Sequence, residues 1–427
     1  MIIIGINPFR SHFIPIISIA RRLQSMGQKI LIIGYEVSRE WVESENFEFI
    51  SIKACEDSDI KKYRRNHLYK DLERCYYQIH DEIYKIIKDL SAVGLFIFPI
   101  SRFDTFFLPA YKAQISMLAY SLSSGAVYIN GCIPPNTSSY IPKYEWDIRV
   151  MGLWLRRIFR KTYEYRYFSL KKYYPYKELI YINKNNMYKW SFSIDGFCFK
   201  LPLIKFGPRE FEFKFHEKAF YAGICVESKV EKLCKENEKN KVVYCTLGTL
   251  SHRYVKAEKY LLALIQIFKK HKEWKLIISL GSENSRVEFN DLPNNVSVYK
   301  YVDQHKVLDK ADLAIIHGGY GTIKECIYHE VPMIVSPSSY DQHGNAARVF
   351  KNEIGVMNQL LKKTFWDRVF SKDITKINEK LLECQIIQVL TDDKYKINIK
   401  ELNTRISENE DLSNLIYFIV KRGMCNG

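Results

Sequence analysis

A glycine turn between a strand and a helix is the first feature of this sequence that could carry chemistry. The apolar run Leu313–Ile316 is typical of a buried strand, and His317 ends it. Gly318 to Gly321 would form a tight turn, and Thr322 to Glu325 opens a helix with capping-box spacing. Backbone N–H groups and the positive end of the helix dipole would then point at one spot, which suits a phosphate. The imidazole of His317 could donate a further hydrogen bond to it.

A carboxylate and a carboxamide follow in a later loop. Val331–Ser336 is another strand candidate, and Asp341 and Gln342 come shortly after it. Side chains beyond the carboxyl edge of a parallel sheet are well placed to bind a ligand, and this pair suits sugar hydroxyls. Taken singly, each would more often be a solvated loop residue, so their meaning depends on the glycine turn beside them.

Parallel α/β folding has to position these side chains, and the chain shows that pattern twice. Near the N-terminus, Met1–Ile6 and Lys29–Gly34 are predicted strands around a helix over Pro15–Met26. Further strands are predicted at Leu95–Pro99 and Ala126–Asn130. In the second half, strands are predicted at 242–246, 275–280, 296–299, 313–316 and 331–336.

The stretch Glu227–Lys241 is charged and poor in apolar residues, as an interdomain linker would be. We therefore predict an N-terminal domain over residues 1–225, a linker over 226–240 and a C-terminal domain over 241–400. Residues 401–427 are predicted to form a C-terminal helix that packs back on the N-terminal domain.

Composition narrows the class of partner without choosing it. The 427 residues carry a formal net charge of +16, which favours phosphates, anionic lipid or nucleic acid. The positive charge is dispersed and no nucleic-acid recognition motif is present, so nucleic acid is the weakest of the three. Ten cysteines form no CxxC pair, which favours free thiols in a reducing compartment over a zinc or redox site. The N-terminus lacks the basic region of a signal peptide, and no apolar run approaches the ~20 residues that cross a bilayer. A cytoplasmic protein, soluble or membrane-associated, is expected.

Several segments together resemble one family. The strongest is His317-Gly-Gly-Tyr-Gly-Thr-Ile-Lys-Glu325, followed by Val331-Pro332, Pro337, Asp341-Gln342 and Asn345-Ala-Ala-Arg348. It resembles the donor signature of the UDP-glycosyltransferase superfamily, and in particular the bacterial macrolide- and zeaxanthin-type members. The similarity continues at Tyr301-Val-Asp-Gln304, Leu247-Gly248-Thr249, Gly207 to Phe213, Tyr221-Ala-Gly223 and Ser11-His12-Phe-Ile-Pro15. The resemblance implies the GT-B fold, in which two Rossmann-like parallel-sheet domains face a cleft, and an inverting transferase.

The resemblance also implies a role for individual residues. Diphosphate contacts are expected from His317, Thr322, Thr249 and the backbone of Gly319 and Gly321. Glu325 would bind the ribose, and Asp341 and Gln342 the sugar, with Gln342 favouring a glucose-type donor. Tyr301 would stack on the base beside Val302 and Gln304. Asp303 stands where the family has proline, and Tyr301 where plant-type members have tryptophan, so the identity of the base is less constrained than the fold.

Inverting transfer needs a base that takes the proton of the acceptor hydroxyl, and histidine suits this task near neutrality. The family places its base where His12 stands, after the first strand. An aspartate often orients that histidine, and Asp104 is the best candidate here. No metal is expected, because the leaving diphosphate would place its charge on the helix N-terminus. Asp57-Ser58-Asp59 superficially resembles the DxD metal site of other sugar transferases, but it follows no apolar strand and is predicted to be a solvated loop.

Residues 149–172 combine eight basic side chains with apolar ones. Such a stretch could lie on anionic membrane and collect a lipophilic acceptor, such as a natural product or lipid. An ordinary surface helix with one apolar face on its own domain is an equally good interpretation. Two further alternatives concern the whole chain: a GT-B nucleotide-sugar epimerase, or a partner protein that keeps the fold without catalysis.

Overall fold

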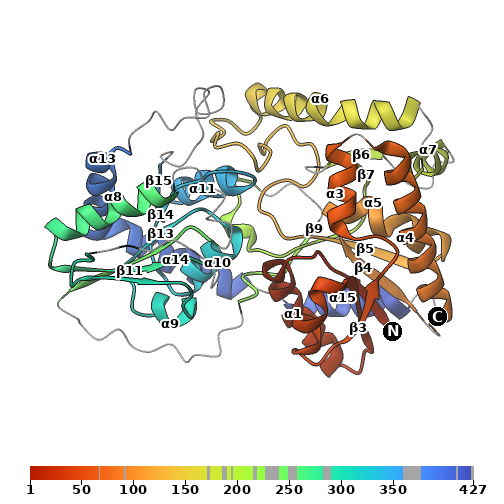
Figure 1. Cartoon of the computed structure of the whole chain (residues 1–427), viewed down its shortest axis with the longest axis horizontal. Coiled ribbons are helices and arrows are strands. Elements are labelled where there is room, and N and C mark those ends of the chain that lie inside the picture. The colour runs from red at the N-terminus through yellow and green to blue at the C-terminus, as the bar shows by residue number, and fades with distance from the viewer. Residues whose placement is uncertain are drawn as a thin grey trace.

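The structure is a computed structural model of the whole chain. It describes residues 1–66, 68–90, 93–170, 174–184, 190–193, 196–214, 219–226, 240–248, 257–281, 289, 291–358, 377–409 and 412–424. Two α/β units lie side by side, and one long helix, α6 (Ile148–Leu170), runs along the top of the N-terminal unit (Figure 1).

The N-terminal unit is built on a seven-stranded sheet in which all paired strands are parallel. Its order is β3 (Glu48–Ile52), β2 (Ile30–Tyr35), β1 (Ile2–Gly5), β4 (Leu95–Pro99), β5 (Ser116–Ser121), β8 (Leu203–Lys205) and β9 (Ala219–Tyr221). The central strands are apolar at every position because helices cover both faces. Ile3 and Leu31 face one core, whereas Ile2 and Ile4 face the other.

The helices on the two faces come from different parts of the chain. On the Ile3 side pack α3 (Asp57–Arg65), α4 (Tyr69–Asp89), α5 (Phe103–Lys112) and α7 (Tyr176–Lys184). On the Ile2 side pack α1 (Arg10–Ser25) and α15 (Leu412–Met424), with the short α2 (Arg39–Glu43) nearby. A small hairpin of β6 (Trp190–Ser193) and β7 (Gly196–Phe199) completes this unit.

The C-terminal unit has a six-stranded parallel sheet. Its order is β12 (Val296–Tyr299), β11 (Trp274–Ser279), β10 (Lys241–Thr246), β13 (Leu313–Ile316), β14 (Met333–Val335) and β15 (Gly355–Met357). One face is covered by α8 (Ala257–Lys270) and α13 (Glu379–Thr391). The other is covered by α9 (Gln304–Leu308), α10 (Tyr320–Tyr328), α11 (Gln342–Lys351) and α14 (Lys394–Asn409). The predicted pair of Rossmann-like parallel-sheet domains is confirmed.

The end of the chain returns to the N-terminal unit. The predicted boundary at residue 400 falls inside α14, whose Ile399, Leu402 and Ile406 belong to the C-terminal core. Helix α15 crosses over, and its Leu415 and Ile416 are buried against the first unit.

Local details of the sequence prediction need correction. Ala126–Asn130 forms no strand, and the strand between β4 and β8 is instead β5, ten residues earlier. Asp57 is no solvated loop residue: it is buried at the start of α3, and its carboxylate lies 2.6 Å from the guanidinium of Arg102. Parallel strands are identified by non-local pairing, which short apolar runs do not encode.

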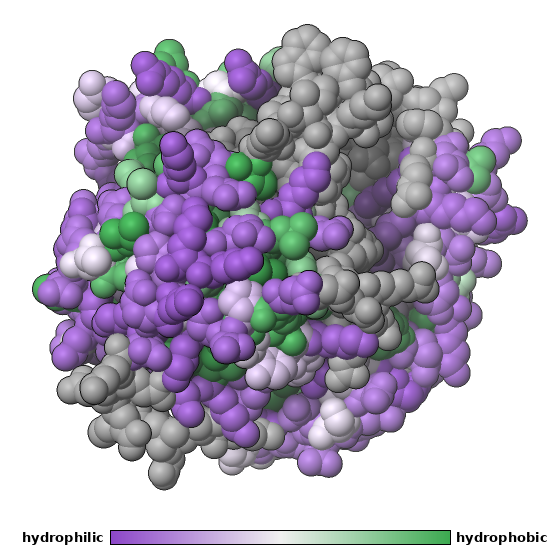
Figure 2. All heavy atoms as spheres, turned by 60° about the vertical axis from the view of Figure 1, so that its left-hand side comes forward, coloured by the Kyte–Doolittle hydropathy of each residue, from purple (hydrophilic) through white to green (hydrophobic). Residues whose placement is uncertain are grey.

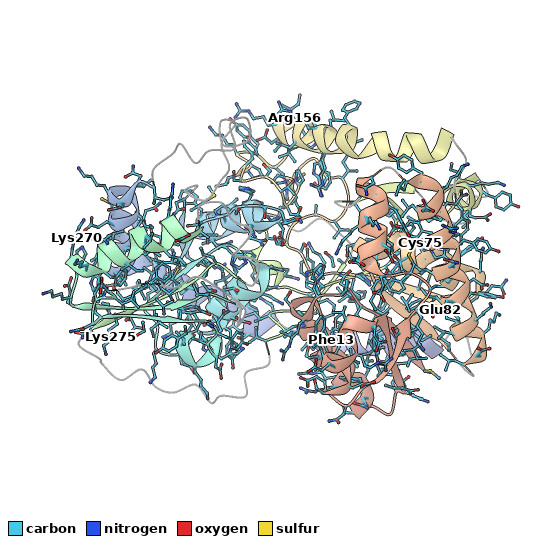
Figure 3. All side chains as sticks on the ribbon, viewed as in Figure 1. Phe13, Cys75, Glu82, Arg156, Lys270 and Lys275 are labelled. Atoms are coloured by element: carbon cyan, nitrogen blue, oxygen red, sulfur yellow. A yellow bond between two sulfur atoms is a disulfide. The ribbon has the colours of Figure 1, made fainter. Side chains whose placement is uncertain are left out.

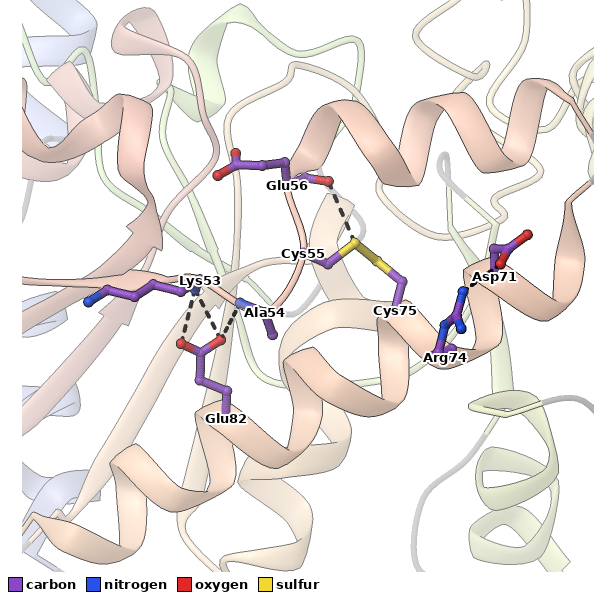
Figure 4. The surroundings of a disulfide bond; sticks show 8 residues. All are labelled: Lys53, Ala54, Cys55, Glu56, Asp71, Arg74, Cys75 and Glu82. Carbon is purple, nitrogen blue, oxygen red and sulfur yellow. Dashed lines mark hydrogen bonds and ion pairs between the residues drawn. A yellow bond between two sulfur atoms is a disulfide. The ribbon is translucent and has the colours of Figure 1, made fainter.

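A disulfide joins Cys55 and Cys75, whose Cα atoms are 5.7 Å apart (Figure 4). The prediction that the cysteines are free thiols is therefore wrong for this pair. The disulfide ties the loop before α3 to α4. In addition, the carboxylate of Glu82 on α4 accepts hydrogen bonds from the amides of Lys53 and Ala54 in that loop. Six other cysteines in the described ranges are free.

Within the described ranges, no helix is long and apolar enough to span a bilayer. The face of the C-terminal unit drawn in Figure 2 is mostly hydrophilic, with hydrophobic residues in small separate groups.

Candidate functional site

The glycine turn lies at the carboxyl end of β13, in the middle of the C-terminal sheet. Gly318 has φ +89°, and a Cβ added there would lie 2.8 Å from the Cγ1 of Val335, so both the conformation and the space require glycine. Gly319 is the N-cap of α10 and brings no side chain to cap it. The helix therefore offers its first N–H groups to a ligand.

The predicted capping box is wrong. Helix α10 begins at Tyr320, two residues before Thr322, and the side chain of Glu325 does not turn back to the helix start. Its carboxylate instead accepts a hydrogen bond from the side-chain amide of Gln304 on α9. The hydroxyl of Tyr244 on β10 donates to the Oε1 of the same glutamine at 3.1 Å. Two residues expected to bind ribose and base are thus brought together at one edge of the sheet.

Burial sets the charge of two side chains here. It lowers the pKa of His317 to about 4, although a hydrogen bond with the backbone of Thr246 opposes the shift. The ring is enclosed by backbone, since a Cβ added at Gly248 or Gly319 would lie 2.6 Å from it. Burial also raises the pKa of Glu325 to about 7, against the opposing effect of its Gln304 bond. Near neutrality His317 is an uncharged hydrogen-bonding group, and Glu325 is half ionised.

The loop after β14 has an internal structure of its own. The Oε1 of Gln342 accepts hydrogen bonds from the amides of Ser338 and Ser339, at 2.9 and 3.0 Å. Asp341 precedes α11, and its Oδ2 accepts from the side-chain amide of Asn345 at 3.3 Å. The oxygen of Gln342 therefore shapes the loop, whereas Asp341 is only partly buried.

The remaining residues expected at the donor side are scattered around this turn. Tyr301 follows β12 and is 64% exposed, so its ring is accessible for stacking. Val302 and Thr322 are half-buried, and Gly321 is exposed. Thr249 lies outside the described residues. None of these placements by itself assigns a ligand contact.

His12 lies in the first turn of α1, which follows the carboxyl end of β1. Its Nδ1 is 3.1 Å from the side-chain nitrogen of Asn7, a buried residue in the loop between them. The Nε of Arg102 donates to the Oδ1 of Asn7 at 3.1 Å. Burial, and secondarily the charge of Arg102, lowers the pKa of His12 to about 4. His12 is therefore a neutral imidazole throughout the physiological range.

Asp104 has other partners than the predicted one. Its carboxylate accepts hydrogen bonds from Arg64 and from the hydroxyl of Tyr76, and its backbone carbonyl is 2.8 Å from His80. Although burial alone would raise the pKa of Asp104, these neighbours and Arg102 lower it. The side chain within hydrogen-bond distance of the His12 ring is that of Asn7. The sequence did not predict this contact, because an asparagine after a strand has no distinctive spacing.

Contacts between the two units bring the two sheet edges together. The amide of Gly344 donates to the carbonyl of Asn136 at 2.8 Å, and the hydroxyl of Ser124 donates to Asn345. Tyr320 packs so closely on Gly207 that a Cβ there would lie 1.9 Å from its hydroxyl. These residues follow the carboxyl ends of β5, β8, β13 and β14. Both carboxyl edges therefore face the same interface, and His12 and His317 each follow a strand of one of them.

A buried ion group crosses the same interface. The Nε of Arg348 on α11 donates to the Oε2 of Glu212 at 2.6 Å, and Lys205 lies 3.3 Å from the other oxygen of that carboxylate. All three side chains are buried. Burial alone would raise the pKa of Glu212, but Arg348 and Lys205 lower it to about 2. Arg348 belongs to the motif that resembles the family, but the sequence did not predict its ion pair with Glu212 across the interface.

No cluster of three or more potential metal ligands is found in the part of the chain that the structure describes. The chemistry that the arrangement supports is anion binding at α10 and proton transfer at a neutral histidine across the interface.

Residues 240–385 match the glycosyltransferase family 28 C-terminal domain. The chain is 29% identical over 158 residues to the NDP-glycosyltransferase YjiC of Bacillus subtilis (strain 168), covering 36% of this chain and 39% of that protein. It is 33% identical over 106 residues to the oleandomycin glycosyltransferase of Streptomyces antibioticus, covering 25% and 24%. A longer match, 24% identical over 389 residues, covers 81% of this chain and 72% of the UDP-glycosyltransferase UGT4 of Dactylopius coccus.

Solved structures extend the similarity to the whole chain. The glycotransferase of kitacinnamycin matches with a TM-score of 0.67 and 17% identity, over 99% of this chain and 98% of that one. CalG4, the calicheamicin glycosyltransferase, matches with a TM-score of 0.68 and 14% identity, over 99% and 97%. At these identities the likeness shows the fold, which is GT-B as predicted. The resemblance stated from the motifs is confirmed.

Proposed function

We propose that this chain, a GT-B protein whose residues 240–385 match the glycosyltransferase family 28 C-terminal domain, transfers a hexosyl group from a nucleotide-diphosphate sugar to a hydroxyl of a small lipophilic acceptor. One observation carries the proposal. The uncapped N-terminus of α10 and the neutral imidazole of His12 follow strands whose carboxyl ends meet at one interface. A donor phosphate and an acceptor hydroxyl can therefore be held at the same place.

The donor is proposed to be UDP-linked and glucose-type. The diphosphate would lie on the first N–H groups of α10, with His317 and Thr322 beside it and the backbone of Gly319 and Gly321 allowing close approach. Glu325 would accept hydrogen bonds from the ribose hydroxyls, and Asp341 from the hexose. Tyr301 would cover the base, next to Val302 and Gln304. Thr249 remains part of the proposal from its position in the sequence motif.

The proposed reaction inverts the anomeric centre. The acceptor oxygen attacks the anomeric carbon and its proton passes to His12, while the bond from that carbon to the diphosphate oxygen breaks. The leaving diphosphate gains negative charge, which the α10 N-terminus and the hydrogen bond of His317 stabilise. These groups suffice for the charge that develops, so no metal ion is invoked.

The hydrogen bonds around His12 add a condition to this mechanism. Arginine only donates, so Arg102 fixes the oxygen of the Asn7 amide towards itself and the amide nitrogen towards Nδ1 of His12. The neutral ring then carries its proton on Nε2. Before His12 can take a proton, the acceptor hydroxyl has to replace Asn7 at Nδ1, or the ring has to exchange its proton. Asp104 is proposed to act indirectly, because its negative charge faces Arg102.

The acceptor class follows from the relatives named for oleandomycin and calicheamicin, whose names describe glycosylation of natural products. A lipophilic acceptor partitions into membranes, so contact of residues 149–172 with a membrane surface is part of the proposal. A cytoplasmic location is also proposed. Six free cysteines in the described ranges favour it, and the Cys55–Cys75 disulfide weighs against it.

The deciding experiment is a panel of nucleotide sugars screened by thermal shift, since a bound donor stabilises the protein by mass action. Donors that bind are then incubated with a library of lipophilic hydroxyl compounds. Release of nucleoside diphosphate in equal amount to a glycosylated product supports the transferase. Conversion of the nucleotide sugar itself, with no acceptor, would show an epimerase. Donor binding without turnover over the whole library would favour a non-catalytic partner protein.

A further inference from the structure

The outer side of α6 exposes a row of large apolar side chains. Ile148 is 72% exposed, Leu155 45% and Phe159 70%. Leu155 and Phe159 follow Ile148 by seven and eleven residues. With 3.6 residues per turn, all three side chains lie on one face of the helix. The row extends backwards into the preceding loop, where Tyr144 and Trp146 are also exposed.

The opposite face of α6 packs the helix against its own domain. Val150 and Trp154 are fully buried against Ala126 and Ile133, and the indole N–H of Trp154 donates to the carbonyl of Ile133 at 2.9 Å. A surface helix needs one apolar face to hold it on its domain. The exposed row is therefore a second apolar face, on the other side of the helix from the contact with Ala126 and Ile133.

Positive charge borders the exposed row. Arg149 and Arg156 are exposed and lie a quarter turn from it, and Figure 3 shows Arg156 at the outer edge of the molecule on α6. The nearby acids are engaged: Asp147 accepts a hydrogen bond from Tyr140, and Glu145 is paired with Lys214. The local field is thus cationic, as is the whole chain at +16.

We infer that this surface, defined by Tyr144, Trp146, Ile148, Arg149, Leu155, Arg156 and Phe159 and called here the α6 outer surface, docks on anionic lipid. The types of side chain on this surface favour anionic lipid as its partner. Aromatic and aliphatic side chains enter the boundary between headgroups and acyl chains, while arginines beside them pair with lipid phosphates. A protein partner would have to match both a convex helix and its flanking cations, whereas an anionic bilayer does so without a specific shape.

The α6 outer surface is joined directly to the proposed transfer site. Arg157 on α6 donates to the hydroxyl of Thr137 at 3.0 Å, and the adjacent Asn136 holds the amide of Gly344 at the start of α11. Docking would therefore place the loop between β5 and α6 next to the lipid. This step deepens the proposed function, on which it rests for its purpose: a lipophilic acceptor would reach the interface from the membrane.

The test is co-sedimentation of the full chain with two kinds of vesicle, at low salt and without donor. One kind is phosphatidylcholine alone, and the other contains about 30% phosphatidylglycerol. Binding is expected to the anionic vesicles and to fall as salt rises, because screening shortens the range of the charges. Arg149→Glu with Arg156→Glu should weaken binding by at least about 25-fold, since each arginine lost accounts for roughly fivefold. Leu155→Ser with Phe159→Ser should weaken it comparably.

Matched controls separate this surface from the overall charge. Lys380→Glu with Lys400→Glu changes the net charge equally at exposed sites of the C-terminal unit, and Ile397→Ser removes an exposed apolar side chain there. Both should bind like the parent. No binding to anionic vesicles at low salt overturns the inference, as does equal loss in the controls. Self-association that the Leu155 and Phe159 changes abolish would assign the surface to a second copy instead.

The outcome is independent of catalysis. Vesicle binding needs no turnover, and transfer to a water-soluble acceptor should be the same in the α6 variants as in the parent. Loss of turnover on every acceptor with retained vesicle binding would count against the proposed function alone. Thermal unfolding of each variant checks that it is folded.

Discussion

The side-chain nitrogen of Asn7 lies 3.1 Å from Nδ1 of His12, and Arg102 holds the oxygen of the same amide at 3.1 Å. The chain thus orients its candidate base with an amide donor, where a carboxylate acceptor would have held the proton on Nδ1. This difference determines which nitrogen is protonated and how strongly basic the ring is.

Asn7→Asp should change the pH profile of transfer. The parent histidine, with its pKa lowered to about 4, stays neutral from pH 5.5 to 8, so kcat at saturating donor should be flat over that range. A carboxylate at position 7 would favour the imidazolium and raise the pKa of His12 by roughly one to three units. Activity of the variant should then fall as pH drops through about 6. Asn7→Ala, which adds no charge, is the control, and a flat profile in Asn7→Asp contradicts the prediction.

His12→Ala should abolish most of the turnover and leave donor binding intact. General-base catalysis contributes about 10²- to 10⁴-fold, so kcat should fall by that factor. Because His12 belongs to the N-terminal sheet edge, the thermal shift caused by UDP-sugar should match that of the parent. Ser11→Ala, at the exposed neighbour, is the control. Retained turnover in His12→Ala would assign the proton transfer to another group.

Donor affinity should rise with pH because of Glu325. Its pKa is raised to about 7, and a carboxylate accepts hydrogen bonds from ribose hydroxyls better than the protonated acid does. Between pH 6 and pH 8 the ionised fraction rises about tenfold, so the Kd for UDP-glucose should fall by a similar factor. The experiment uses UDP-glucose as the ligand, because the terminal phosphate of UDP itself titrates near pH 6 and would add its own pH dependence. Calorimetry on Glu325→Gln should show weaker binding with no such slope, and an unchanged slope would refute the assignment.

Arg348→Met should destabilise the interface between the two units by about 3–5 kcal/mol, because it leaves the Glu212 carboxylate buried without its main partner. The double variant Arg348→Met with Glu212→Gln should recover part of that loss. The pKa of Glu212 is lowered to about 2, so its contribution to stability is complete above about pH 4.5 and is lost as pH falls towards 2. Urea unfolding at pH 7 and pH 3.5 measures both effects. Equal stability of the parent and the single variant would contradict them.

Removing the disulfide should destabilise the N-terminal unit. Cys55 and Cys75 are 20 residues apart, and closing a loop of that size contributes about 3 kcal/mol. A reducing agent should lower the melting temperature of the parent and have no effect on Cys55→Ala with Cys75→Ala. Alkylation of the protein in its native compartment, read by mass spectrometry, shows whether the bond exists there. Free thiols at both positions under native conditions would remove this contribution.

The strands that the sequence predicted best have mostly apolar residues and lie between turn residues. Leu95–Pro99, Val296–Tyr299 and Leu313–Ile316 have the predicted bounds. β5 has serine at both ends and was missed, while Ala126–Asn130 has a similar apolar centre but forms no more than an isolated β-bridge at Tyr128. Apolar runs predict burial, and only pairing across the sheet distinguishes a strand from a buried loop.

The candidate site likewise has one part that the sequence predicts and another that it does not. The anion-binding turn was predictable because its strand, glycines and helix are contiguous in the chain. The partners of Asp104 were not, since Arg64 and Tyr76 precede it by 40 and 28 residues and no motif links them. The bond between Arg102 and Asn7 spans 95 residues, and that between Glu212 and Arg348 spans 136. Contacts over such separations are set by the fold, so single-sequence reasoning finds the ligand-binding backbone before the side chains that tune it.

Helix α15 has a consequence for how the protein is made. Its Leu415, Ile416 and Ile419 complete the core on the α1 side of the first sheet, although they follow the whole second unit in the chain. Domains generally fold in order as they leave the ribosome. Here part of one apolar face of the first unit stays uncovered until the second unit has been translated. The first unit therefore completes its core only after the second has been synthesised, and a stop codon before residue 412 removes core residues of the unit that was synthesised first.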